Sequence, residues 1–148
     1  MYTERKQDLS VYYWAVDLFS DATFITVTDG FPVSDLVLPT IAVETDTIDS
    51  VPFQLGTRVR NKIRRWYIDV FADNKSQRDE YSYRIINTLE DPIPVYDYDE
   101  GFPPPTPTQI GYLSIDDINM RIIKVLPELS EKLYYRSVVS FSTEYSEI

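Results

Sequence analysis

The stretch RRWYIDVFADNKSQRDEYSYRIINTLED, residues 64–91, decides the fold. Its early part, WYIDVF, is apolar enough for a central strand. A turn at Ala-Asp-Asn follows, and the next residues carry an apolar face at helical spacing, made by Tyr81, Ile85, Ile86 and Leu89. Ser76 and Asp79 predict a capping box at the start of this helix, and Asp91-Pro92 predicts its end. The unit is therefore strand, short turn, helix.

Other segments give further elements on either side of this unit. Apolar residues at helical spacing predict a helix over residues 4–19. Alternation predicts strands at 24–28, 38–45, 95–98 and 133–145, and residues 46–57 read as an irregular connection. Residues 58–72 predict the longest strand, with a change of phase after Arg65 that indicates a bulge or a tight bend. Residues 110–126 fit both a helix and a strand.

This order of elements predicts the fold class. Runs of strands with only two helices indicate an α+β fold with a mostly antiparallel sheet flanked by those helices. The 148 residues fit one domain spanning 1–148. Six of the ten prolines lie in residues 91–108, so we expect a stiff loop or arm at about 97–109.

Composition argues against catalysis. The chain has no histidine and no cysteine, which removes the commonest general base, the commonest metal ligand and a thiol nucleophile. It also has no nucleotide-binding or nucleophile-elbow motif. The acidic run at Asp97, Asp99 and Glu100 lacks the later glutamate of a calcium loop, because Pro107 stands there. We therefore expect no enzyme, no cofactor and no metal site.

The most informative charges are five basic residues within eight positions, namely Arg58, Arg60, Lys62, Arg64 and Arg65. Alternate residues of a strand share a face, so four of them form a ladder of like charge that something must compensate. One interpretation is a solvated edge strand that its charges protect from aggregation. A second is a contact with the acidic surface of another copy, and a third is nucleic-acid phosphate. The net charge of −10 makes the third the weakest.

Several segments together resemble the tail terminator and neck proteins of tailed bacteriophages, which join the head and complete the tail. They are the N-terminal helix, LPTIAVE at 38–44, FQLG at 53–56, WYIDVFADNKSQRDE at 66–80, and YRSVVSF at 135–141. The resemblance favours a strand for residues 110–126. It covers most of the chain as a pattern of elements, and none of its motifs is catalytic.

The resemblance implies a structural virion protein, assembled in the host cytoplasm. It would form a ring, commonly a hexamer, that terminates the tail tube and docks it to the head connector or adaptor proteins. DNA would pass through the lumen without specific binding, and an acidic lumen would let that polyanion slide. The N-terminal residues lack the apolar segment of a secretory signal, and we expect no membrane partner.

The same reasoning names a subunit interface as a hypothesis. It combines the five basic residues with part of the proline arm, which could reach a neighbouring ring or tube: Phe102, Pro103, Pro104 and Pro105. The alternatives are another neck or tail subunit, such as a connector adaptor, stopper, tube or baseplate protein, or a soluble peptide-binding module that uses the proline arm.

Overall fold

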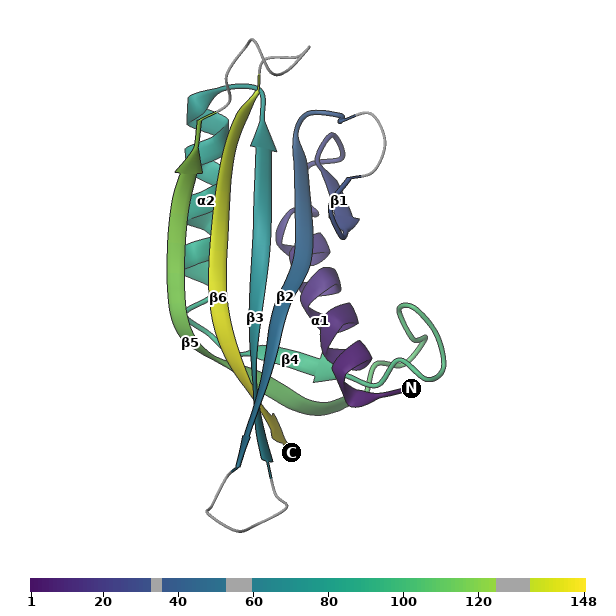
Figure 1. The fold of residues 1–148 in the computed structure, drawn as a ribbon. Helices are drawn as coiled ribbons and strands as arrows, with labels where there is room; N and C mark the ends of the chain where they lie inside the picture. Colours follow the sequence, from purple (N-terminus) through teal and green to yellow (C-terminus); the bar gives the residue numbers. More distant parts are fainter. Residues whose placement is uncertain (33–35, 53–59, 125–133) are drawn as a thin grey trace.

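The structure is a computed structural model that describes residues 1–32, 36–52, 60–124 and 134–148. Eight elements follow one another along these residues: α1 (Thr3–Leu18), β1 (Thr26–Asp29), β2 (Thr40–Pro52), β3 (Arg60–Ala72), α2 (Lys75–Thr88), β4 (Ile93–Tyr96), β5 (Gln109–Ile123) and β6 (Tyr135–Glu147). Figure 1 shows a curled sheet with the two helices behind it.

The six strands form one sheet in the order β1-β2-β3-β6-β5-β4. Only β1 and β2 are parallel, and the other four pairings are antiparallel. The predicted α+β class with a mostly antiparallel sheet is thus confirmed. The strand alternative for residues 110–126 is also confirmed, because β5 occupies most of that segment.

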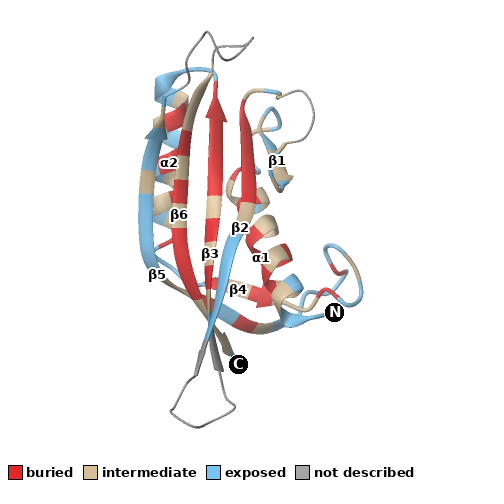
Figure 2. Cartoon of the chain, in the orientation of Figure 1, coloured by how far each residue is buried: buried red, intermediate tan, exposed pale blue. Residues whose placement is uncertain are grey.

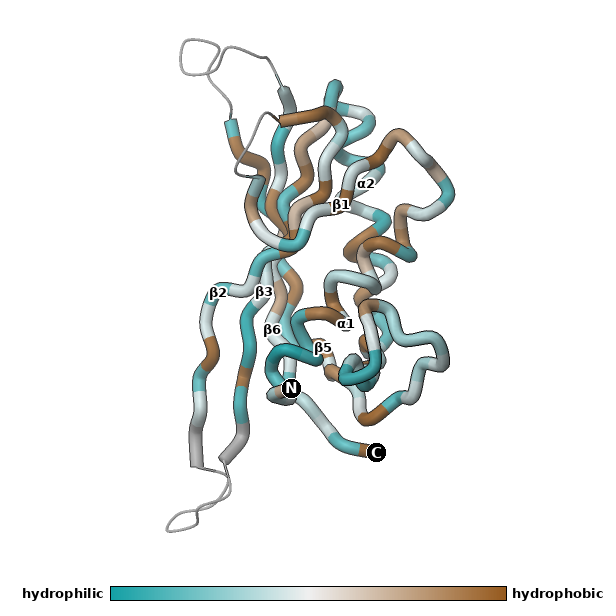
Figure 3. Tube along the Cα trace, turned by 90° about the vertical axis from the view of Figure 1, so that its right-hand side faces the viewer, coloured by the Kyte–Doolittle hydropathy of each residue, from teal (hydrophilic) through white to brown (hydrophobic). Residues whose placement is uncertain are grey.

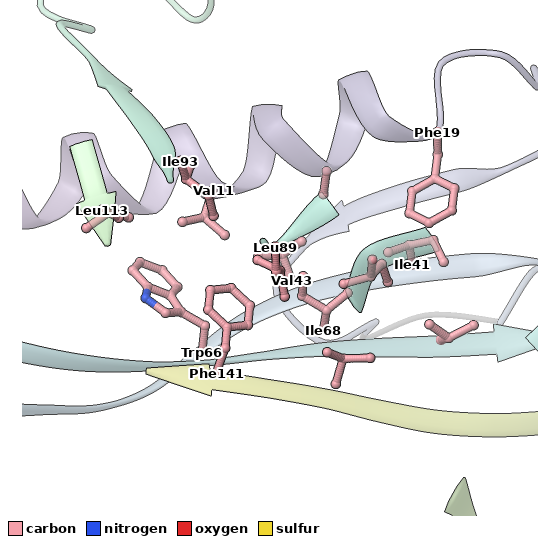
Figure 4. Close-up of a cluster of buried hydrophobic side chains, with 14 of the residues drawn as sticks. Val11, Phe19, Ile41, Val43, Trp66, Ile68, Leu89, Ile93, Leu113 and Phe141 are labelled. Carbon is pink, nitrogen blue, oxygen red and sulfur yellow. The ribbon is translucent and has the colours of Figure 1, made fainter. Parts of the chain in front are cut away.

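The core lies between the helices and one face of the sheet, which we call the helix-side face. Trp66, Ile68 and Val70 of β3 are almost fully buried there. In Figure 4, Trp66 and Phe141 point from their strands towards Val11 of α1. Figure 2 shows the result, with buried residues concentrated in the centre of the sheet and β5 exposed along much of its length. The unit quoted at the outset therefore supplies the middle of the core.

The predicted bulge in β3 is wrong. β3 pairs with β6 without interruption from Ile63 to Ala72. The irregularity lies in the neighbouring strand, where β2 carries an extra residue between Thr45 and Ile48, opposite Arg65. The apparent change of phase has another cause, because Arg64 occupies a helix-side position in regular alternation with Trp66.

β2 is longer than predicted. It continues to Pro52, so residues 46–52 of the expected irregular connection are strand. The remainder of that prediction, residues 53–57, lies outside the described residues. The segment escaped prediction because Asp46 to Ser50 are all exposed, so no buried face gives them an apolar alternation.

The N-cap of α2 lies two residues earlier than the predicted cap, Ser76. Asn74 is the N-cap, and its Oδ1 accepts a hydrogen bond from the backbone N–H of Gln77 at 2.8 Å. The Gln77 side chain in turn accepts from the backbone N–H of Asp73 at 2.8 Å. Two backbone donors at the helix start are thereby satisfied.

We expect Asn74→Ala to lower the free energy of unfolding by about 1 kcal/mol, because the N–H of Gln77 loses its acceptor. Urea denaturation followed by circular dichroism measures this. Ser76→Ala is the matched control, since Ser76 is exposed and lies inside the helix, and it should change stability by less than about 0.5 kcal/mol. Equal effects of the two substitutions would contradict this assignment of the cap.

Candidate subunit interface

β2 and β3 run past the rest of the sheet as a hairpin arm. β6 pairs with β3 only from Ile63 onward, so the β2–β3 pairs from Ser50–Lys62 to Pro52–Arg60 extend beyond β6. We call residues 48–52 and 60–63 the β2–β3 arm. Figure 3 shows the arm leaving the body of the molecule towards the lower left. A two-stranded ribbon is only marginally stable in water when neither a third strand nor a helix packs against it.

The predicted ladder of charge lies partly on this arm. Lys62 and Arg64 lie on the same face of β3 as Trp66, and Arg65 lies on the opposite face. Arg58 and the side chain of Arg60 fall outside the described part of the chain. The structure therefore places three of the five predicted basic side chains.

Arg64 is a buried residue with partners inside the chain. Only 2% of it is exposed, and its guanidinium lies over the Trp66 ring at 4.3 Å from the centroid. Its nitrogens bond to a set of oxygens on α1 and β2: the Glu4 carbonyl at 2.9 Å, Gln7 Oε1 at 3.2 Å, Asp8 Oδ1 at 2.7 Å and Thr45 Oγ1 at 3.3 Å. This side chain fixes the N-terminal half of α1 on the sheet.

Lys62 uses a second acid of the same helix. Its ammonium pairs with the Glu4 carboxylate, and this hydrogen bond lowers the pKa of Glu4. Burial raises the pKa of Asp8, and its ion pair with Arg64 opposes that rise only in part. Acidic groups of the same chain thus compensate two of the five charges, those of Lys62 and Arg64. Of these two side chains only Lys62 is exposed, and Arg65, on the opposite face, is partly exposed.

The proline-rich segment is fixed at its base. Lys6 Nζ pairs with Asp97 at 3.0 Å and with Asp99 at 3.1 Å, and the N-terminal amine pairs with Asp99 at 3.2 Å. The hydrogen bonds raise the pKa of Lys6 and lower that of Asp99. Tyr98 is buried and stacks on Tyr13 with 5.7 Å between ring centroids. The segment is therefore packed against α1 along part of its length.

The four interface residues predicted in this segment differ in exposure. Phe102 is 58% exposed, with its ring 6.4 Å from that of Tyr98. Pro103 and Pro105 are exposed, whereas Pro104 is buried. Between the segment, α1 and β4 lies a groove of about 290 Å³, lined mainly by aromatic rings and prolines that include Tyr13, Trp14, Tyr96, Tyr98 and Pro104.

The face of the sheet away from the helices is open at its centre, and we call it the open face. Arg136 donates two hydrogen bonds to Asp69 Oδ1, at 3.1 and 2.7 Å, beside a depression of about 300 Å³. Arg121 lines the same depression. Sequence reasoning missed this face. The alternation of Tyr67 and Asp69 against Trp66 and Ile68 is the signal that could have indicated it.

Within the described residues, no group of three or more acidic side chains is placed to hold a metal ion. No helix in this part of the chain is long and apolar enough to cross a membrane. No protein-family model matches the chain, and no curated protein matches its sequence.

Proposed function

We propose that this protein is a structural subunit of a bacteriophage neck. It forms a ring that terminates the tail tube and joins it to the head connector, and DNA passes through the lumen. The observation that carries the proposal is the β2–β3 arm, a two-stranded ribbon extending beyond the sheet with no described element covering its end. Such a ribbon gains stability by packing on another subunit.

Charge supports assembly between copies. The chain carries a net charge of −10, while two basic residues, Arg60 and Lys62, belong to the β3 strand of the arm. Two different surfaces of opposite charge suit a head-to-tail contact, and such contacts close into rings when the rotation between copies allows it. The partners in this proposal are further copies, six in all as the resemblance to tail terminators implies, with the tube protein on one side and connector or adaptor proteins on the other.

The net negative charge of the chain fits the passage of DNA through the lumen. A lumen of negative potential does not bind DNA, so the polyanion can move through it. The proposal includes no membrane partner and no catalytic step. In this proposal the protein is part of the virion, and it is assembled in the host cytoplasm. The alternative is another neck or tail subunit, such as an adaptor, stopper, tube or baseplate protein, which would also assemble through the arm and the acidic surface.

The groove beside the proline-rich segment favours a second candidate function. Aromatic side chains and prolines line it, and Asp17 lies at its border, which suits an extended proline-containing peptide with a basic residue. This candidate is a soluble peptide-binding module. It predicts a protein that stays monomeric, whereas the neck proposal predicts assembly.

Charge reversal on the arm tests the neck proposal. We expect Arg60→Glu with Lys62→Glu to reduce or abolish the oligomer in sedimentation velocity while the chain stays folded by circular dichroism. Because Lys62 pairs with Glu4, this variant also loses an internal ion pair. Adding Glu4→Lys restores that pair and leaves the charge of the arm reversed. Assembly should stay lost in this triple variant, and an unchanged oligomer size would contradict the role of the arm.

A further inference from the structure

The sheet has an open edge at each end. β4 pairs with β5 only at residues 109–113, so from Ser114 to Ile123 the described neighbour of β5 is β6 alone. At the other end, β1 pairs with β2 only at Thr40–Val43, so from Glu44 onward the described neighbour of β2 is β3 alone. Open edges present unpaired backbone N–H and C=O groups, which form a template for another strand.

Both edges also expose apolar side chains. Ile48 of β2 is 48% exposed and Ile122 of β5 is 54% exposed. Ile48 lies opposite Arg64, and Ile122 lies opposite the buried Ser137, so both isoleucines are on the helix-side face. An exposed apolar edge strand normally aggregates unless it is covered or paired.

Strand direction allows one edge to meet the other. β2, β3, β6 and β5 are successively antiparallel, so β2 is antiparallel to β5. Two copies placed side by side in the same orientation would therefore bring the β2 edge of one against the β5 edge of the next as an antiparallel pair. The sheet would continue from copy to copy with all helices on one face.

The side chains select a register. When Ile48 of one copy is opposite Ile122 of the next, Asp49 is opposite Arg121, and both of these lie on the open face. Neither Asp49 nor Arg121 has an ion pair within the described residues. Opposite charges facing each other across an antiparallel pair stabilise it.

Other registers that keep the two faces matched are less complementary. Placing Ile48 opposite Met120 would set Asp49 against Asn119, which carries no charge. Placing Ile48 opposite Ile118 would set Asp49 against Asp117, a pair of like charges. A slip of one residue would move every side chain to the wrong face. Apolar contact and charge pairing therefore favour the same register, with Ile48 opposite Ile122 and Asp49 opposite Arg121.

We propose that β2 of one copy pairs antiparallel with β5 of a second copy, with Ile48 opposite Ile122 and Asp49 opposite Arg121. The inference rests on the proposed ring function, because it names the two surfaces through which the copies join. In this arrangement the β2 edge of each copy is covered by the β5 edge of one neighbour, and its β5 edge is covered by the β2 edge of the other neighbour.

The absence of cysteine from the sequence makes a clean cross-linking test possible. Residues directly opposite in an antiparallel pair have Cβ atoms about 4.5–5.5 Å apart, close enough for a disulfide with little adjustment. Oxidation of Ile48→Cys/Ile122→Cys should give a ladder of covalent oligomers on a non-reducing gel. The matched control Ile48→Cys/Ile118→Cys moves one thiol four residues along β5 and should give no ladder.

Charge exchange provides a second readout. Asp49→Arg or Arg121→Asp alone, introduced into the double-cysteine chain, should cause loss of the ladder. The two together should restore it, because the ion pair is then re-formed in the opposite sense.

The outcomes separate this inference from the ring proposal. A ladder as strong for the control, or a covalent dimer from Ile122→Cys alone, would overturn the pairing of β2 with β5. Absence of a ladder from a protein that light scattering shows to be multimeric would overturn the pairing and leave the ring standing. A chain that stays monomeric by both methods, also when tail tubes are added, would overturn both.

Discussion

Replacing Arg64 with alanine is expected to lower the free energy of unfolding by about 3 kcal/mol. The substitution removes hydrogen bonds to Gln7, Asp8, Thr45 and the Glu4 carbonyl, together with the stacking on Trp66. Acceptors that face the interior are then left without a donor. Urea denaturation measures the change.

Lys62→Ala is the matched control for this variant. Lys62 lies two residues away on the same face and also pairs with an acid of α1, but half of its side chain is exposed. Solvent screens an exposed pair, so its loss should cost less than about 1 kcal/mol. If Arg64→Ala were no more destabilising than Lys62→Ala, Arg64 would not be what fixes α1 on the sheet.

The pH dependence of Arg64→Ala follows from Asp8. Burial already raises the pKa of Asp8, and the guanidinium opposes that rise, so removing Arg64 raises this pKa further. A carboxyl whose pKa is higher in the folded chain than in the unfolded chain favours folding at low pH. That contribution is lost as pH rises through the folded-state pKa. The deficit of Arg64→Ala relative to wild type should therefore be larger at neutral pH than at about pH 4.

Trp66→Ala is expected to cost about 3–5 kcal/mol, because a fully buried indole is removed from the middle of the core. Its Nε1 also donates to Thr143 Oγ1 at 2.9 Å, and the ring supports Arg64. Thr143→Val separates these contributions, since it removes the acceptor and keeps the packing, and it should cost about 1 kcal/mol. A change below about 2 kcal/mol for Trp66→Ala would contradict the assignment of Trp66 to the centre of the core.

These two variants should not be additive. The Arg64 guanidinium lies against the Trp66 ring, so the stacking is lost in either single variant and can be lost only once. The double variant should therefore cost less than the sum of the two single effects.

The sequence predicted the elements that bury an apolar face. WYIDVF formed the centre of the sheet, and Tyr81, Ile85 and Leu89 formed the buried side of α2, because their spacing matches the periods of strand and helix. The end of β2 was missed since both of its faces meet solvent. The cap was misplaced because Asn74 and Ser76 are both residues that cap helices, and local sequence does not rank them.

The candidate interface was predictable only in part. Alternation correctly put Lys62 and Arg64 on one face of a strand, while Arg58 and the side chain of Arg60 lie outside the described part of the chain. It could not show that this face turns inward at Arg64, because Glu4 and Asp8 lie far away along the chain and meet it only through the packing of α1. Their spacing of four residues on one side of a helix was the available signal.

The mass of the purified protein in solution, measured by light scattering at two concentrations, tests the central claim most directly. The neck proposal predicts an oligomer of ring size, or a 17.3 kDa monomer that becomes one when tail tubes are added. A chain that stays monomeric at both concentrations and is indifferent to tubes would contradict it. The arm would then be a solvated edge protected by its charges.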